Sequence, residues 1–139
     1  MKILNTISSF SDDARLILEK LGEVTYLTPT QDKLVETLRD FDVALIGLGL
    51  RFDREILSAS PQLKVIATAT TGLDHIDTTY ADQRGIKVLS LRGEDAFLDT
   101  ITSTAELAFG LMVSLMRQIV PASESVKTYV WARERFRGH

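Results

Sequence analysis

Short β-branched or leucine-rich runs recur at intervals of roughly twenty residues, and this spacing constrains the fold more than any other feature. The runs cover residues 2–5, 24–27, 43–46, 65–69 and 88–91. Helical patterns of apolar residues fill the gaps between them. Alternating strands and helices with short connections are typical of βα units whose strands form one parallel sheet. The sequence therefore predicts an α/β fold with about five parallel strands and helices on both faces.

Capping signals place the helices of this flavodoxin-like architecture. Ser11 is the expected N-cap of a first helix, and Gly22 sits where a left-handed residue would end it. Asp77 should lead the fourth helix and Gly85 should close it. The four expected helices cover residues 11–21, 30–39, 53–59 and 78–84.

The pattern changes after Leu91. Residues 92–102 are expected to form a connecting segment. After it, Ser103 and Glu106 match a capping box. The helix that follows, residues 103–117, is apolar all round and needs burial on more than one side. Pro121 should start another helix that runs to about Arg135. We expect a sheet domain at residues 1–100 and a two-helix arm at 101–139.

Composition excludes several classes of protein. The absence of cysteine rules out disulfides, thiolate zinc sites and a cysteine nucleophile. A net charge of −3 gives no reason to expect nucleic acid or an anionic membrane as partner. The apolar run at residues 107–116 is shorter than the roughly 20 residues that a bilayer span needs. We expect a soluble, cytoplasmic protein.

The most informative stretch follows the fourth expected strand and begins Thr70-Thr71-Gly72. Ligands of open parallel sheets bind outside the carboxyl ends of the strands. Gly72 permits close backbone approach and a positive φ, so the amides around it could cup a carboxylate. An ordinary turn also fits these residues, with Asp77 capping the next helix.

Two other features resemble functional motifs only weakly: a glycine-rich loop and a histidine between acidic residues. The loop Gly47-Leu48-Gly49 lacks the third glycine of a dinucleotide fingerprint, because position 52 is Phe, so we expect a flexible cleft loop. His75 lies between acidic residues, but adjacent loop residues rarely make a preorganised metal site. We expect a solvated or turn-capping histidine and no metal site.

Three motifs in succession carry a family resemblance: TGLDHID at 71–77, RGIKV at 84–88 and TAEL at 104–107. In order and spacing, residues 40–135 resemble the N-terminal part of the D-isomer-specific 2-hydroxyacid dehydrogenases. That family includes phosphoglycerate dehydrogenases and glyoxylate/hydroxypyruvate reductases. The resemblance implies that residues 1–100 open a substrate domain, and that residues 101–139 open a nucleotide domain.

The resemblance also implies roles for individual residues. The substrate-binding candidates are Thr70, Thr71, Gly72, Leu48 and Arg51, and Thr104 would approach the cofactor. For Thr104, a simple helix-start residue is the other interpretation. The implied homodimer forms through the helix 103–117 and the arm 121–137. The implied parent enzyme uses NAD or NADP to interconvert small 2-keto acids and D-2-hydroxy acids.

In the family, the catalytic Arg, Glu and His and the dinucleotide fingerprint lie beyond position 139. We therefore expect a truncated, inactive chain that binds no cofactor alone. Gly47 stands where many relatives have arginine, which argues against a phosphorylated substrate, although Arg51 could replace it. The connection 88–106 is also about five residues longer than the family pattern. A flavodoxin-like small-molecule binding module and a dimerisation fragment without activity remain the alternatives.

Overall fold

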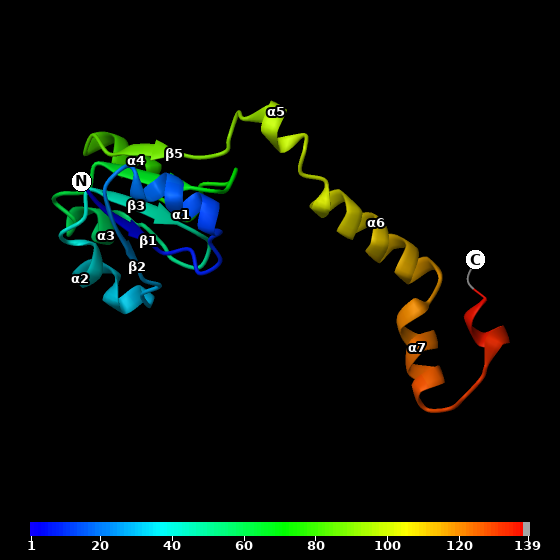
Figure 1. The fold of residues 1–139 in the computed structure, drawn as a ribbon. Coiled ribbons are helices and arrows are strands. Elements are labelled where there is room, and N and C mark those ends of the chain that lie inside the picture. Colours follow the sequence, from blue (N-terminus) through cyan, green and yellow to red (C-terminus); the bar gives the residue numbers. More distant parts are fainter. Residues whose placement is uncertain (138–139) are drawn as a thin grey trace. The chain divides into compact units, whose positions relative to one another are not determined.

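The computed structural model describes residues 1–137 and divides the chain into two compact units, Met1–Glu94 and Asp95–His139 (Figure 1). The first unit contains one five-stranded parallel sheet in the order β2-β1-β3-β4-β5. Its strands are β1 (Lys2–Asn5), β2 (Glu23–Tyr26), β3 (Val43–Ile46), β4 (Val65–Thr68) and β5 (Lys87–Leu89). The predicted five-stranded α/β architecture is confirmed.

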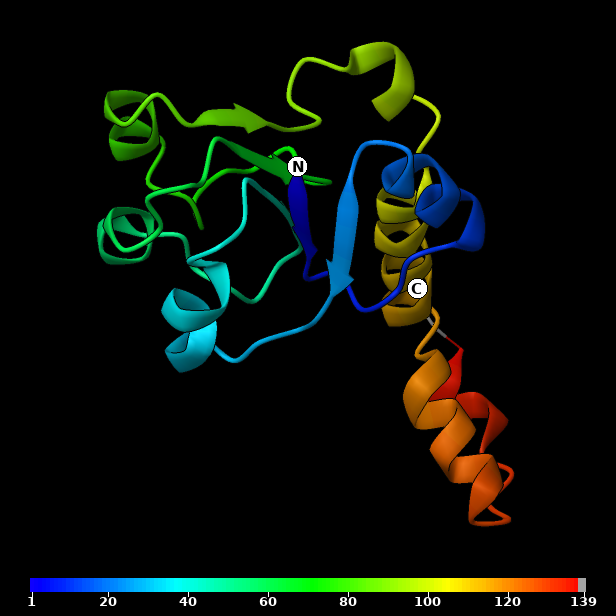
Figure 2. The ribbon, with the colours of Figure 1, turned by 60° about the vertical axis from the view of Figure 1, so that its left-hand side comes forward.

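The direction of each crossover decides which face its helix covers. Parallel crossovers are right-handed, so a connection that reverses direction along the sheet also changes face. The step from β1 to β2 runs opposite to every later step. Accordingly, Figure 2 shows α1 on one face and α2, α3 and α4 on the other. These helices span Asp12–Glu19 (α1), Leu34–Leu38 (α2, preceded by the 3-10 turn η1, Gln31–Lys33), Arg54–Ser58 (α3) and Thr78–Gln83 (α4).

Burial differs between the two faces of the sheet. Ala44, Ile46 and Ile66 point toward α2–α4 and are buried in the main apolar cluster. The alternate residues on these strands, which point to the α1 side, are only partly covered: Val43, Leu45, Val65 and Ala67. Parallel sheets are normally covered on both faces. Within residues 1–94, α1 is the one helix on its face, where these residues of β3 and β4 are only partly buried.

The predicted caps are largely confirmed. The Ser11 hydroxyl accepts from the Ala14 amide at 3.3 Å, and the Asp77 carboxylate accepts from the Tyr80 amide at 2.9 Å. Gly85 has the left-handed φ of +68° that closes α4. The expected role of Gly22 is wrong, because its φ is not left-handed.

Gly22 is instead a point of close backbone approach. A Cβ at this position would lie 2.3 Å from the Met1 carbonyl oxygen. The neighbouring Glu23 amide donates a hydrogen bond to the Met1 carbonyl at 3.0 Å. The glycine allows β2 to come alongside the start of β1.

The helix predicted at residues 103–117 is confirmed, but the segment before it and its N-cap differ from expectation. The segment predicted as a connection holds the short helix α5 (Asp95–Leu98). The N-cap of α6 (Ser103–Met116) is Thr102 rather than Ser103. The Thr102 side chain makes no cap hydrogen bond, and its hydroxyl donates instead to the Glu106 carboxylate at 2.6 Å, so the predicted capping box is wrong.

The helix that follows α6 is shorter than predicted. Helix α7 (Ile119–Lys127) begins two residues before Pro121, directly after Gln118 with φ +50°. It ends at Lys127 rather than near Arg135, and a separate 3-10 turn, η2 (Arg133–Phe136), follows. The early end coincides with Thr128, whose hydroxyl donates to the Ser125 carbonyl at 2.9 Å.

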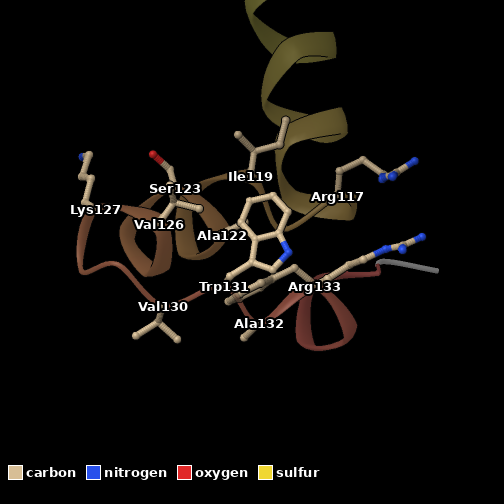
Figure 3. A pocket seen from close by; sticks show the side chains of 11 residues that line it. Arg117, Ile119, Ala122, Ser123, Val126, Lys127, Val130, Trp131, Ala132 and Arg133 are labelled. Carbon is tan, nitrogen blue, oxygen red and sulfur yellow. The ribbon is translucent and has the colours of Figure 1, made fainter.

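None of the residues of α6 is buried, although most of them are apolar. Its exposed large side chains are Leu107, Phe109, Leu111, Met112, Val113, Leu115 and Met116. Beside α7 and η2 lies an apolar hollow of about 730 Å³, lined by residues that include Val126, Trp131 and Phe136 (Figure 3). No single helix in residues 1–137 is long and apolar enough to cross a membrane; α6 and α7 reach that length and composition only together, with a 63° bend between them.

Candidate functional site

The candidate site lies where the strand order reverses. Neighbouring strands β1 and β3 send their following segments in opposite directions along the sheet, which is the switch point where doubly wound sheets bind ligands. Leu48 and Arg51 follow the carboxyl end of β3, and Thr70–Gly72 follow that of β4. The structure therefore brings the five predicted substrate-binding residues to one edge of the sheet.

The loop after β4 has its carbonyl groups engaged. Four consecutive carbonyl oxygens, those of residues 70–73, each accept one hydrogen bond. The donors are the Leu91 amide to Thr70 (3.0 Å), the Arg92 Nε to Thr71 (3.2 Å), the Thr70 hydroxyl to Gly72 (2.8 Å) and the Ile76 amide to Leu73 (2.9 Å). The polar acceptors of the loop are therefore satisfied from within the first unit.

The amides of the same loop are free. Among the residues that the structure describes, none accepts a hydrogen bond from the backbone N–H of Thr71, Gly72 or Leu73. Successive unpaired amides form a concave surface that favours an anion. Satisfied carbonyls and free amides together make the backbone of this loop a candidate anion site, with the Asp74 carboxylate beside Gly72.

The expected positive φ at Gly72 is wrong, since the left-handed glycines are Gly49, Gly85 and Gly93. A Cβ at Gly72 would meet only the Asp74 carboxylate, at 3.6 Å, an ordinary contact. The backbone geometry thus does not demand glycine here. The side chain nearest to Gly72 is the Asp74 carboxylate.

The Thr70 hydroxyl is used within the loop and helps to position it. Its Oγ1 donates to the Gly72 carbonyl and lies 3.0 Å from the buried Thr68 hydroxyl. Sequence reasoning missed Thr68. A polar residue that ends an otherwise apolar strand is the signal that could have found it, and the same signal applies to Asn5.

Asn5 ends β1 and is almost fully buried. Its Oδ1 accepts from the Ile7 amide at 2.9 Å, which fixes the orientation of the side-chain amide. The Nδ2 of Asn5 is buried without a hydrogen-bond partner among the described residues. Buried donors without a partner are costly, so this nitrogen is a group that a ligand could satisfy. Sequence reasoning missed this polar group at the switch point.

The loop after β3 is exposed at its tip and fixed at its base. Leu48 is 79% exposed, and Gly49 has a φ of +106°. Further on, the Phe52 amide donates to the His75 carbonyl at 2.7 Å, and the Asp77 amide donates to the Phe52 carbonyl at 2.9 Å. These bonds join the β3 and β4 loops, with a small hollow of about 180 Å³ between them that is lined by Arg51, Asp53 and Asp74–Asp77.

The residues around this hollow do not make a metal centre. In residues 1–137 no cluster of three or more His, Asp or Glu side chains could hold an ion. Asp53 and Asp77 are used as helix N-caps. The Nε2 of His75 is buried and unpartnered among the described residues, so the expectation of a solvated or turn-capping imidazole is wrong for this nitrogen.

The Gly47-Leu48-Gly49 loop does not fit a dinucleotide pyrophosphate. The next helix, α3, already has its N-terminus capped by Asp53, whose Oδ1 accepts from the Ile56 amide at 3.0 Å. A carboxylate at that position repels a second anion. Thr104 is exposed in the first turn of α6 and makes no side-chain hydrogen bond to a described residue.

Comparison with known proteins identifies the family. The model of the D-isomer specific 2-hydroxyacid dehydrogenase catalytic domain matches residues 3–130. The chain belongs to this family of oxidoreductases, as the three motifs predicted. It is 37% identical to the D-3-phosphoglycerate dehydrogenase of Methanocaldococcus jannaschii over 139 residues, which cover 99% of this chain and 25% of that protein. It is 36% identical to the hydroxypyruvate reductase of Thermotoga maritima, covering 84% of this chain and 36% of that one.

Solved structures agree on the fold. The D-lactate dehydrogenase of Aquifex aeolicus, complexed with NAD and lactic acid, matches with a TM-score of 0.80 at 21% identity, covering 100% of this chain and 41% of that one. The TT0316 protein of Thermus thermophilus matches with a TM-score of 0.80 at 25% identity, covering 94% and 42%. The chain thus spans well under half of each of these relatives.

Proposed function

We propose that this chain supplies the substrate-carboxylate site of an NAD(P)-dependent oxidoreductase that interconverts small 2-keto acids and D-2-hydroxy acids. The loop at residues 70–73, with its carbonyls engaged and its amides free, carries the proposal. Family membership supports the reaction class, and relatives named hydroxypyruvate reductase and glyoxylate reductase support a small 2-keto acid as substrate.

In this proposal the amides of Thr71, Gly72 and Leu73 hold the substrate carboxylate. Thr70 keeps the loop in shape through its bond to the Gly72 carbonyl. Arg51 adds positive charge from the β3 loop, and Leu48 provides an apolar wall. The bound 2-keto acid is thereby oriented by its carboxylate, which leaves the keto carbon free to face the cofactor.

The nicotinamide cofactor, when bound, supplies the hydride that reduces the keto carbon. Residues 1–139 contain no G-x-G-x-x-G, and the α3 N-terminus is already capped, so this chain offers no pyrophosphate site in its first unit. We assign Thr104 a contact near the cofactor and place the proton-donating and nucleotide-binding residues outside this chain. Residues 1–139 alone are then inactive and bind no cofactor.

Titration of ¹⁵N-labelled residues 1–139 with sodium pyruvate, followed by NMR, tests the carboxylate site. We expect the amide resonances of Thr71, Gly72 and Leu73 to shift in a saturable way, with an affinity on the order of millimolar. Methyl pyruvate, which has the same shape without the charge, is the matched ligand control. Equal shifts with both ligands, or none with either, would show that the loop is an ordinary turn.

A variant sharpens this experiment. Gly72→Val places a branched side chain next to the free amides and against the Asp74 carboxylate. We expect pyruvate affinity to fall at least tenfold while the rest of the spectrum stays unchanged. In the parent enzyme the same variant should raise KM for the keto acid far more than KM for the cofactor.

We also propose that the second unit forms a homodimer through α6 and the arm at residues 121–137. The exposed apolar side chains of α6 support this, because burying a Leu or Met side chain contributes roughly 1.5–3 kcal/mol. The hollow beside Trp131, which is 82% exposed, adds a second apolar surface in the arm (Figure 3). Exposed patches of this kind mark interfaces.

Light scattering at micromolar concentrations tests the dimer. Wild type should scatter as twice 15.5 kDa, and Leu111→Glu with Met112→Glu should shift it to monomer. The control variant adds two acidic charges at exposed positions of the first unit, Gln62→Glu and Gln83→Glu, and should stay dimeric. A wild-type monomer across the concentration range would overturn the proposal.

A further inference from the structure

Arg92 contacts the loop at residues 70–73, named here the anion loop, from outside it. The residue follows β5, and its side chain is exposed. Its Nε donates to the Thr71 carbonyl at 3.2 Å, across 21 positions of sequence. The preceding Leu91 amide donates to the Thr70 carbonyl at 3.0 Å, so two consecutive residues hold two consecutive carbonyls. Among the described residues, no carboxylate forms an ion pair with Arg92.

Peptide geometry fixes what this contact does. The Thr71 carbonyl and the Gly72 N–H belong to one peptide group, which is planar and trans, so the two bonds point in opposite directions. A donor on the carbonyl side therefore leaves the Gly72 N–H directed away from Arg92. The guanidinium does not reach an anion that the Gly72 amide holds; it acts through the peptide between them.

The charge of Arg92 matters as well as its geometry. A hydrogen bond from a guanidinium to a carbonyl is charge-assisted and stronger than a neutral one. It polarises the peptide, and hydrogen bonds in such chains strengthen one another. The Gly72 N–H is then a better donor to a carboxylate than an amide whose carbonyl bonds to water.

We propose that Arg92 is the positioning residue of the anion loop, holding and polarising the Thr71–Gly72 peptide so that its N–H binds the substrate carboxylate. This inference rests on the proposed function and identifies a residue that acts on the same site. It also gives the site a cationic contribution in a chain that has Gly47 at the start of the β3 loop. Lysine would bring charge without the planar fork that lets Nε donate while the terminal nitrogens stay solvated.

The experiment compares Arg92→Ala, Arg92→Lys and the control Arg39→Ala by NMR, with sodium pyruvate as ligand. Arg39 is exposed at the end of α2 and makes no side-chain hydrogen bond to a described residue. In Arg92→Ala we expect pyruvate affinity to fall about tenfold and the free Gly72 amide proton to move upfield. Arg92→Lys should recover less than half of either effect, and Arg39→Ala should match wild type.

Chemical rescue separates positioning from general stability. Added guanidinium at millimolar concentration should partly restore both the Gly72 proton shift and pyruvate affinity in Arg92→Ala, and should change neither in Arg39→Ala. Wild-type affinity together with an unmoved Gly72 resonance in Arg92→Ala would overturn the inference about Arg92. If wild type itself fails to bind pyruvate, the carboxylate site is wrong; the Gly72 proton shift in the ligand-free variants still decides whether Arg92 polarises the peptide.

Discussion

The side-chain amide of Gln31 spans both backbone polar groups of Arg51. Its Oε1 accepts from the Arg51 N–H at 2.8 Å, and its Nε2 donates to the Arg51 carbonyl at 2.9 Å. Gln31 begins the turn before α2, so a residue 20 positions earlier fixes the base of the β3 loop. The position of Arg51 at the candidate site therefore depends on a residue outside the loop.

Gln31→Ala should loosen this loop without unfolding the sheet. Both hydrogen bonds are exposed, so we expect a loss of about 1 kcal/mol in the free energy of unfolding. Amide exchange at Arg51 should accelerate more than exchange at Ile46. Gln31→Glu keeps the acceptor and loses the donor, so it should restore protection of the Arg51 amide alone. Unchanged amide exchange at Arg51 in Gln31→Ala would contradict the role of the two Gln31 hydrogen bonds in fixing the loop.

Gly22→Ala should destabilise the first unit by about 1–3 kcal/mol, the usual cost of overpacking. A Cβ at residue 22 meets the Met1 carbonyl at 2.3 Å, so β2 must move relative to the chain start. Urea denaturation measures the change. Gly110→Ala is the matched control, since a Cβ there has nothing within 4 Å and helical alanine is favoured over glycine. It should leave stability equal or higher.

Asp42 should make stability depend on pH in the acid range. The Lys64 ammonium, at 2.7 Å, and the Lys2 amide, at 2.9 Å, hold the pKa of the Asp42 carboxyl below its ordinary value. A lowered folded-state pKa contributes stability above the unfolded value of 3.8, and this contribution is lost as pH falls through the folded value. Asp42→Asn should therefore lower the urea midpoint at pH 6, and its difference from wild type should be smaller at pH 3. An equal difference at both pH values would mean that the charge is not responsible.

Residues 1–139 should not oxidise NADH or NADPH in the presence of glyoxylate, hydroxypyruvate or pyruvate. The chain contains no dinucleotide fingerprint, and the Nε2 of His75, which follows the loop at residues 70–73, is buried. Absorbance at the reduced-nicotinamide band measures turnover. Activity that scales with protein concentration through successive purification steps would refute this prediction, while pyruvate binding to the loop would be unaffected by it.

The sheet was predictable because its signals are local. The strands coincide with β-branched or leucine-rich runs, and Ser11, Asp53 and Asp77 cap helices through side chains three residues from their partners. Gly85 was predictable for the same reason, as a helix end followed by a strand. The chemistry of these elements is contained within a few residues of sequence.

The features that the sequence did not predict depend on tertiary contacts or on a shift of one residue. Gly22 was assigned a helix-end role because nothing local reveals that Met1 lies against it. Arg92 escaped notice because its partner, Thr71, is 21 residues away. The α6 cap moved from Ser103 to Thr102, a choice between adjacent hydroxyl residues that both precede Glu106.

The one-sided cover of the sheet also has a calorimetric consequence. The heat capacity change of unfolding follows the apolar surface that becomes exposed, about 12–15 cal/mol/K per residue in ordinary domains. In the first unit, Val43, Leu45, Val65 and Ala67 already meet solvent in part before unfolding begins. The unit should then unfold with a heat capacity increment below that range, and its stability should vary less steeply with temperature. Anything that later covers this face would restore the ordinary value.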